Sequence, residues 1–178
     1  MSTLVKTDLN LPMWAKGVIA VAGTGVILFG LYQGYQAWDK HNRSKDANAV
    51  SDSAKDTYKD LLKKGQKLTY PESAYGTAAN TIQKLLNGGE TITTEIQVVN
   101  EIIKVVKKPV DWYYLISVFA SRDIDDLGYG KSNYDLPTLL KDQLDSTLIG
   151  DKVNGKFYWS EDTLYPLTEY LANMGITI

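Results

Sequence analysis

The feature that most constrains this chain is an uncharged apolar tract near its N-terminus, GVIAVAGTGVILFGLY at residues 17–32. Sixteen apolar residues fall short of the ~20 that cross ~30 Å of hydrocarbon, but residues 14–38 offer ample length. We therefore predict an N-terminal tail over residues 1–13 and a transmembrane helix over 14–38. The alternatives are a buried helix of a soluble domain and a cleaved signal peptide. Too few apolar residues precede the cleavage-like Ala20-Val21-Ala22 for a signal.

Both ends of the predicted span carry the residue types that anchor helices at membrane interfaces. Aromatic rings settle at the headgroup level, and long cationic side chains reach outward to water. Basic residues stand on both sides, so the orientation in the membrane stays open. The predicted interface residues are Trp14, Lys16, Tyr32, Tyr35, Trp38, Lys40, Arg43 and Lys45.

Small residues recur along one side of the same segment. Gly23, Ile27, Gly30 and Gly34 are spaced by four, three and four residues, so they share one helix face. Such a face lets a second helix approach closely, which predicts packing against a partner helix and a homo-oligomer. The alternative is that glycine is simply frequent in membrane helices.

A polar, basic segment follows at residues 39–67, where we predict a stalk and a first helix. Residues 40–67 hold eight Lys or Arg and four Asp, whereas residues 109–178 hold five basic and eleven acidic residues. A basic collar beside a bilayer is attracted to anionic headgroups. The alternative is a solvated linker whose charges only maintain solubility.

Residues 68–178 show helical periodicity and predict a compact head of five or six short helices, so the expected fold class is all-α. Apolar residues recur every three or four positions in each predicted helix. The segment Lys156-Phe157-Tyr158-Trp159 has the character of a strand but no evident partner, and residues 150–155 indicate a turn. The predicted helices cover residues 75–86, 94–106, 111–121, 135–144 and 163–174, with Asp135 as one cap and a loop over 122–133.

The order of elements from Ser73 to Leu144 resembles an annexin repeat. A helix ending in Gly88-Gly89, a Thr-capped helix, and a helix ending in Phe119-Ala120-Ser121-Arg122-Asp123 are similar to its first three helices. In annexins the glycine-rich loop and a later acidic residue bind calcium at a membrane. The resemblance implies a calcium site at Gly88-Gly89 and Asp126, although the Glu90-Thr91-Ile92 insertion departs from the family's loop.

The whole layout, a single-pass anchor with a small cysteine-free head, resembles the minor membrane-associated structural proteins of lipid-containing bacteriophages. This resemblance is one of architecture only. It implies a location in a virion internal membrane or a bacterial inner membrane, and a capsid or envelope component as partner.

The amino-acid composition excludes several classes of function. The chain has no cysteine, one histidine (His41) and a formal charge of −2, so thiol nucleophiles, Cys-ligated zinc and a general basic field for nucleic acid are absent. We expect no cofactor, no metal and no nucleic-acid partner. The best enzymatic alternative is a membrane-anchored cell-wall hydrolase that uses paired carboxylates from Glu90, Glu95 and Glu101.

The predicted function is therefore a noncatalytic structural protein that links a bilayer to a protein assembly. Tyrosine and tryptophan are favoured at interfaces, and the head is rich in them. Either they anchor a partner or most of them pack against the helices. The candidate anchors are Tyr113, Tyr114, Tyr129, Tyr134, Tyr158 and Trp159.

Overall fold

A computed structural model describes residues 26–89, 91–125 and 131–178, and it describes the side chains of residues 45–89, 91–125 and 133–178. The chain divides into two compact units, residues 1–41 and residues 42–178. The helix α2 (Val26–Lys63) continues through residue 38, where the predicted span ends. The tail, and residues 14–25 of that span, lie outside the described residues.

The prediction of a transmembrane helix joined to an all-α head is wrong on two counts. First, within the described residues no helix is both long enough and apolar enough to cross a membrane. The reason is visible in α2: the described apolar residues end near Tyr32, and polar residues fill the helix from Asp39 onward. The location at a membrane stays a prediction.

The second correction is that the head contains strands as well as helices. The strands β1 (Arg122–Asp125) and β2 (Lys131–Tyr134) form one antiparallel pair, where we had predicted a loop. The strands β3 (Thr147–Val153) and β4 (Lys156–Asp162) form a second antiparallel pair. The predicted strand at residues 156–159 therefore has a partner, in β3.

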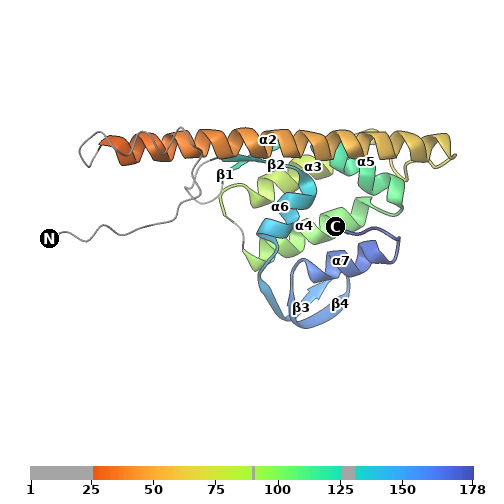
Figure 1. Ribbon diagram of the computed structural model, residues 1–178. Helices are drawn as coiled ribbons and strands as arrows, with labels where there is room; N and C mark the ends of the chain where they lie inside the picture. Colours follow the sequence, from red (N-terminus) through yellow and green to blue (C-terminus); the bar gives the residue numbers. More distant parts are fainter. Residues whose placement is uncertain (1–25, 90, 126–130) are drawn as a thin grey trace. The chain divides into compact units, whose positions relative to one another are not determined.

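Three helices supply most of the core of residues 42–178. The helix α3 (Glu72–Leu86) packs against α4 (Ile92–Val105) and α5 (Pro109–Phe119), as Figure 1 shows. Their buried faces follow the periodicity read from the sequence. The largest fully buried side chains of these helices are Trp112, Tyr75, Phe119, Ile82, Leu86, Ile102 and Leu115.

The start of α4 differs from the prediction by one turn. The sequence predicts a helix that begins at Thr94, but Thr91 is the N-cap, and Thr94 is the third helical residue. The Thr94 backbone N–H donates to Thr91 Oγ1, and the Thr91 backbone N–H donates to Thr94 Oγ1. Two threonines thus satisfy each other's free amides in the manner of a capping box.

Asp111, in the first turn of α5, ties three parts of the chain together. Its fully buried carboxylate accepts hydrogen bonds from Thr69 N and Tyr75 Oη to one oxygen, at 2.9 and 2.6 Å. The other oxygen accepts from Thr69 Oγ1 and the backbone N–H groups of Lys107 and Lys108. Burial by itself raises the pKa of this carboxyl, but hydrogen bonds from Tyr75, Thr69 and Lys107 outweigh burial and lower the pKa.

The two remaining helices pack on different members of this group, one on α5 and the other on α4. The helix α6 (Leu136–Gln143) begins at Asp135, whose carboxylate accepts from the Thr138 backbone N–H, as predicted. The helix α7 (Tyr165–Ala172) packs on α4 through buried Leu167 and Leu171. The strand β3 also contacts α4, so the β3–β4 hairpin and α7 share one supporting helix.

Candidate functional site

The β3–β4 hairpin is closed by a two-residue turn, Asn154-Gly155. Both residues have positive φ, 46° and 86°, and Val153 pairs with Lys156 across the turn. Asn-Gly is the pair that a type I′ turn favours, because that turn needs φ > 0 at both central positions. The local sequence therefore favours a tight turn between β3 and β4.

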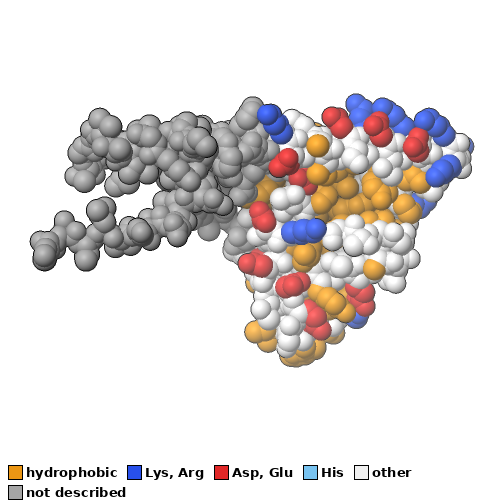
Figure 2. Space-filling view, in the orientation of Figure 1, with side chains coloured by type: hydrophobic (Ala, Val, Ile, Leu, Met, Phe, Trp, Pro, Cys, Tyr) orange, Lys and Arg blue, Asp and Glu red, His pale blue; other side chains and the backbone are white. Residues whose placement is uncertain are grey.

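The hairpin presents two different faces. Leu148, Val153 and Tyr158 are buried against the body of the head. On the other side Ile149 is 75% exposed, Phe157 60% and Trp159 65%. We call these three residues the hairpin face; hydrophobic side chains at the β3–β4 end are visible in Figure 2.

Two contacts hold the aromatic rings of the hairpin face in place. The Trp159 ring lies over Gly150, where an added Cβ atom would come within 2.8 Å of the ring carbon Cη2. The Lys152 ammonium lies 5.6 Å from the centre of the Phe157 ring, within the range of a cation–π contact. Both contacts restrict the conformations of the exposed rings, which lowers the entropy lost on binding.

Side-chain carboxylates accept hydrogen bonds from the backbone N–H groups of the paired residues Ile149 and Trp159. The Ile149 N–H donates to Asp151 Oδ2 at 2.8 Å, and the Trp159 N–H donates to Glu161 Oε2 at 2.7 Å. A further β-strand would need such N–H groups to pair with the hairpin edge. The arrangement protects the edges here and leaves the side-chain face as the accessible surface.

A buried glutamate fastens the base of the hairpin. Glu95 of α4 is fully buried, and its carboxylate accepts from the Ser146 N–H at 3.1 Å and from the hydroxyls of Ser146 and Thr163. Ser146 precedes β3 and Thr163 follows β4, and the Thr163 N–H also donates to the Ser146 carbonyl. One side chain thus holds both ends of the hairpin to α4.

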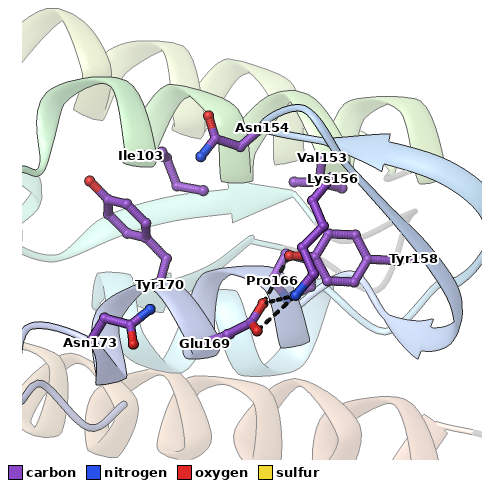
Figure 3. A pocket seen from close by; sticks show the side chains of 9 residues that line it. All are labelled: Ile103, Val153, Asn154, Lys156, Tyr158, Pro166, Glu169, Tyr170 and Asn173. Atoms are coloured by element: carbon purple, nitrogen blue, oxygen red, sulfur yellow. Dashed lines mark hydrogen bonds and ion pairs between the residues drawn. The ribbon is translucent and has the colours of Figure 1, made fainter.

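Behind the hairpin lies a pocket of about 330 Å³ between β4 and α7, shown in Figure 3. Its charged groups satisfy each other: Lys156 Nζ lies 2.7 Å from Glu169 Oε2, and Tyr158 Oη donates to the same oxygen at 3.0 Å. The hydrogen bond from Lys156, then that from Tyr158, lowers the pKa of the Glu169 carboxyl. The pocket walls also include Ile103, Val153, Asn154, Pro166, Tyr170 and Asn173.

This ion pair fixes β4 to α7 and presents no uncompensated charge to a ligand. The Lys156 ammonium also lies 4.9 Å from the Tyr158 ring centre. The hydrogen bond to Glu169 raises the pKa of Lys156, and burial, then Glu169, raises that of Tyr158. All three groups keep their ordinary charge near neutral pH, so we assign them to support of the hairpin.

The carboxylates of the hydrolase alternative do not converge within the described residues. Glu95 is enclosed and fully hydrogen-bonded, so an external polymer has no access to it in this conformation. Glu101 forms an ion pair with Lys104 one turn along α4, at 3.2 Å. Glu90 lies outside the described residues.

Other predicted sites fall largely outside the described residues. Trp14, Lys16 and Gly23 are in that part of the chain, as is Asp126 of the annexin-like calcium loop. Within residues 26–44 only the α2 backbone is described, so the roles of the other interface and helix-packing residues stay predictions. Those residues are Ile27, Gly30, Tyr32, Gly34, Tyr35, Trp38, Lys40 and Arg43.

Asp123 and Asp125 lie in β1, and Gly88 donates its N–H to the Asp125 carbonyl at 2.9 Å. Over residues 45–89, 91–125 and 133–178, no group of three or more histidines and carboxylates is placed to hold a metal ion. Lys45, the one predicted interface residue whose side chain is described, is exposed. The calcium site implied by the annexin resemblance includes Asp126 and stays a prediction.

The candidate aromatic anchors divide between the core and the surface. Tyr134 and Tyr158 are buried, and Tyr113 and Tyr114 are half-buried against the core. Tyr129 lies outside the described residues, and Trp159 is exposed. The sequence analysis missed Ile149 and Phe157, which the Asn154-Gly155 turn signal could have placed beside Trp159 on one face.

Comparison with known proteins adds no relative: no family model matches the chain, and no curated protein or solved structure matches it either.

Proposed function

We propose that this chain is a noncatalytic interaction protein that binds a protein partner through the hairpin face. The observation that supports this is the exposure of Ile149, Phe157 and Trp159 together on one face of the hairpin. Two aromatic rings and an isoleucine expose on the order of 300 Å² of apolar surface. A patch of that size is comparable with the largest apolar patch of a typical monomer, and such patches are often functional.

The chemistry around the hairpin face defines the kind of partner. Asp151, Glu161 and Asp162 surround the Ile149–Trp159 pair in sequence, while Lys152 and Lys156 stand nearer the turn. Residues 145–169 hold five acidic and two basic residues, so the surface is acidic overall. A complementary partner has an apolar groove with basic residues beside it, because opposite charges steer association and disfavour wrong partners.

Site-directed photo-crosslinking tests this proposal in the full-length chain. Phe157 is replaced by a photoreactive phenylalanine analogue, and adducts are identified by mass after illumination of the native assembly. The matched control carries the same analogue at Gln97, an exposed residue of α4. We expect one discrete adduct from position 157 and none from position 97.

Equal labelling at both positions, or no adduct at position 157, would contradict the proposal. The capsid or envelope component expected from the sequence is one partner that the adduct's mass would identify. The peptide to which position 157 couples reports the partner's surface as well as its identity.

A further inference from the structure

The sequence contains two Asn-Gly pairs, Asn87-Gly88 and Asn154-Gly155. Asparagine is a chemically labile residue, and a following glycine hinders reaction at its side chain least, because glycine has no Cβ atom. All four residues are exposed, so access to water does not distinguish the two pairs. Their hydrogen bonds do.

The first pair is held by β1 through both of the groups that would have to react. Asn87 is the C-cap of α3. Its side-chain Oδ1 accepts from the Asp125 backbone N–H at 2.9 Å, and the Gly88 N–H donates to the Asp125 carbonyl at 2.9 Å. The side-chain amide of Asn87 and the backbone nitrogen that follows it are therefore both engaged.

The second pair has neither of these restraints. Asn154 and Gly155 form the turn of the β3–β4 hairpin, and a Cβ atom added at Gly155 would meet nothing within 4 Å. The Asn154 backbone N–H donates to Asn100 Oδ1 at 3.0 Å, which ties the turn to α4. Within the described part of the chain, no hydrogen bond engages the Asn154 side-chain amide or the Gly155 N–H, and no dashed line reaches that side chain in Figure 3.

We infer that Asn154 is a site of spontaneous covalent modification in the folded protein, whereas the contacts with β1 protect Asn87. The Gly155 backbone nitrogen loses its proton to a base in solution and attacks Asn154 Cγ. The new N–C bond closes a succinimide ring, and the side-chain nitrogen takes up a proton and leaves as ammonia. Water then opens the ring at either carbonyl, which gives aspartate or isoaspartate and needs no other reactant.

Both products alter the hairpin at its turn. Each replaces a neutral amide by a carboxylate, which adds a negative charge to the pocket that contains the Lys156–Glu169 ion pair. Isoaspartate also routes the main chain through the side-chain carbon atoms, so the backbone between Val153 and Lys156 becomes one atom longer. Loop length sets the register of a hairpin, so this form should loosen the strand pairing from the turn outward.

The hydrogen bonds of Asn87 determine the size of the difference between the two sites. Both bonds to Asp125 must break before the Gly88 nitrogen can attack the side chain. Two hydrogen bonds of ordinary net strength correspond to a reaction about 30-fold slower at Asn87 than at Asn154. The difference comes from the fold, so it should disappear in the unfolded chain, where glycine follows both asparagines.

Peptide mass mapping of the full-length chain tests the inference. The protein is incubated at physiological pH and temperature, in buffer and in concentrated urea, and is then digested at mildly acidic pH. The mass gained when an amide becomes an acid reports conversion at each site, and enzymatic methylation reports isoaspartate. Asn154→Gln is the matched variant, because glutamine keeps the amide but cannot close the five-membered ring.

In buffer we expect Asn154 to convert about 30-fold faster than Asn87, and in urea we expect similar rates at the two sites. Asn154→Gln should abolish the fast conversion and its isoaspartate signal. Equal conversion of the two sites in the folded protein would overturn the inference. An Asn154 that converts in urea but stays unmodified in buffer would also overturn it, because the turn would then protect the residue.

Hydrogen exchange of the modified protein tests the effect on the hairpin. Residues 147–162 should exchange faster in the isoaspartate form than in the unmodified protein, while α3 should be unchanged. Equal exchange of residues 147–162 in the two forms would contradict the loosening of the turn. The modification does not depend on a partner for the hairpin face, and photo-crosslinking at position 157 tests that partner separately.

Discussion

Replacing Asp111 by asparagine should cost about 3–5 kcal/mol of the free energy of unfolding. The carboxylate accepts five hydrogen bonds from Thr69, Tyr75, Lys107 and Lys108, and all of them point at a fully buried group. An asparagine keeps one oxygen, and its amide then faces a backbone N–H group that has no acceptor. Each buried donor left without a partner costs ~1–3 kcal/mol, and bonds to a charged group contribute more than neutral ones.

The assay is urea unfolding of the full-length chain, followed by circular dichroism, with Asp52→Asn as the control. Asp52 is an exposed aspartate on α2, so its replacement should change stability by less than ~0.5 kcal/mol. If Asp111→Asn lowers the free energy of unfolding by less than ~1 kcal/mol, the reasoning is refuted. That result would mean that the carboxylate does not hold α5 to the segment around Thr69.

The same substitution should change the pH dependence of stability. The pKa of Asp111 is lower in the folded protein than in the unfolded chain, where it is about 4. The stabilisation is therefore fully present above about pH 5 and is lost as the pH falls through the lowered folded value. The stability difference between wild type and Asp111→Asn should shrink over that acidic range and stay constant from pH 5 to 8.

Three further predictions concern the support of the hairpin. Gly155→Ala should destabilise the protein by about 1–2 kcal/mol in urea unfolding, because φ is 86° there and a Cβ atom strains that conformation. Glu95→Ala should speed hydrogen exchange of residues 147–162 more than that of α3, since it frees both ends of the hairpin from α4; equal acceleration would contradict the anchoring role. Lys156→Met should raise the pKa of Glu169 toward its ordinary value in an NMR titration, with little change in stability for so exposed a pair.

The helices of the core could be predicted because each encodes its own periodicity. The stripe Tyr75, Ala78, Ala79, Ile82 appears as the buried face of α3, and Trp112, Leu115 and Phe119 as that of α5. Asp135 is the N-cap of α6, as expected. In these segments local propensity and tertiary packing favour the same structure, so the sequence pattern is sufficient.

The strands β1, β2 and β3 were missed because a two-stranded hairpin has little periodic signal. The pairing of β3 with β4 is irregular at two places, between Thr147 and Ile149 and between Ile149 and Asp151, where Gly150 lies. The Asn154-Gly155 pair was interpreted only as a turn, although it is the strongest short hairpin signal in the chain. Without that pairing, Ile149 and Phe157 could not be placed on the same face as Trp159.

The membrane prediction depended on a window that includes residues outside the described part of the chain. Within α2, the run from Val26 to Tyr32 is too short by itself, and charged residues follow from Asp39. Helix α2 therefore changes along its length from an apolar start to a polar, charged second half. Its later residues contribute Ala47 and Ala54 to the buried surface of the head.

The most direct test of the account is hydroxyl-radical footprinting of the native assembly beside the dissociated protein, read by mass spectrometry. Trp112, 2% exposed, and Tyr70, 40% exposed, are internal references for buried and exposed rings. The account predicts that Trp159 and Phe157 are oxidised readily in the dissociated protein and strongly protected in the assembly, while Tyr70 changes little. Equal oxidation of Trp159 in both states would contradict the claim that the hairpin face is the binding surface.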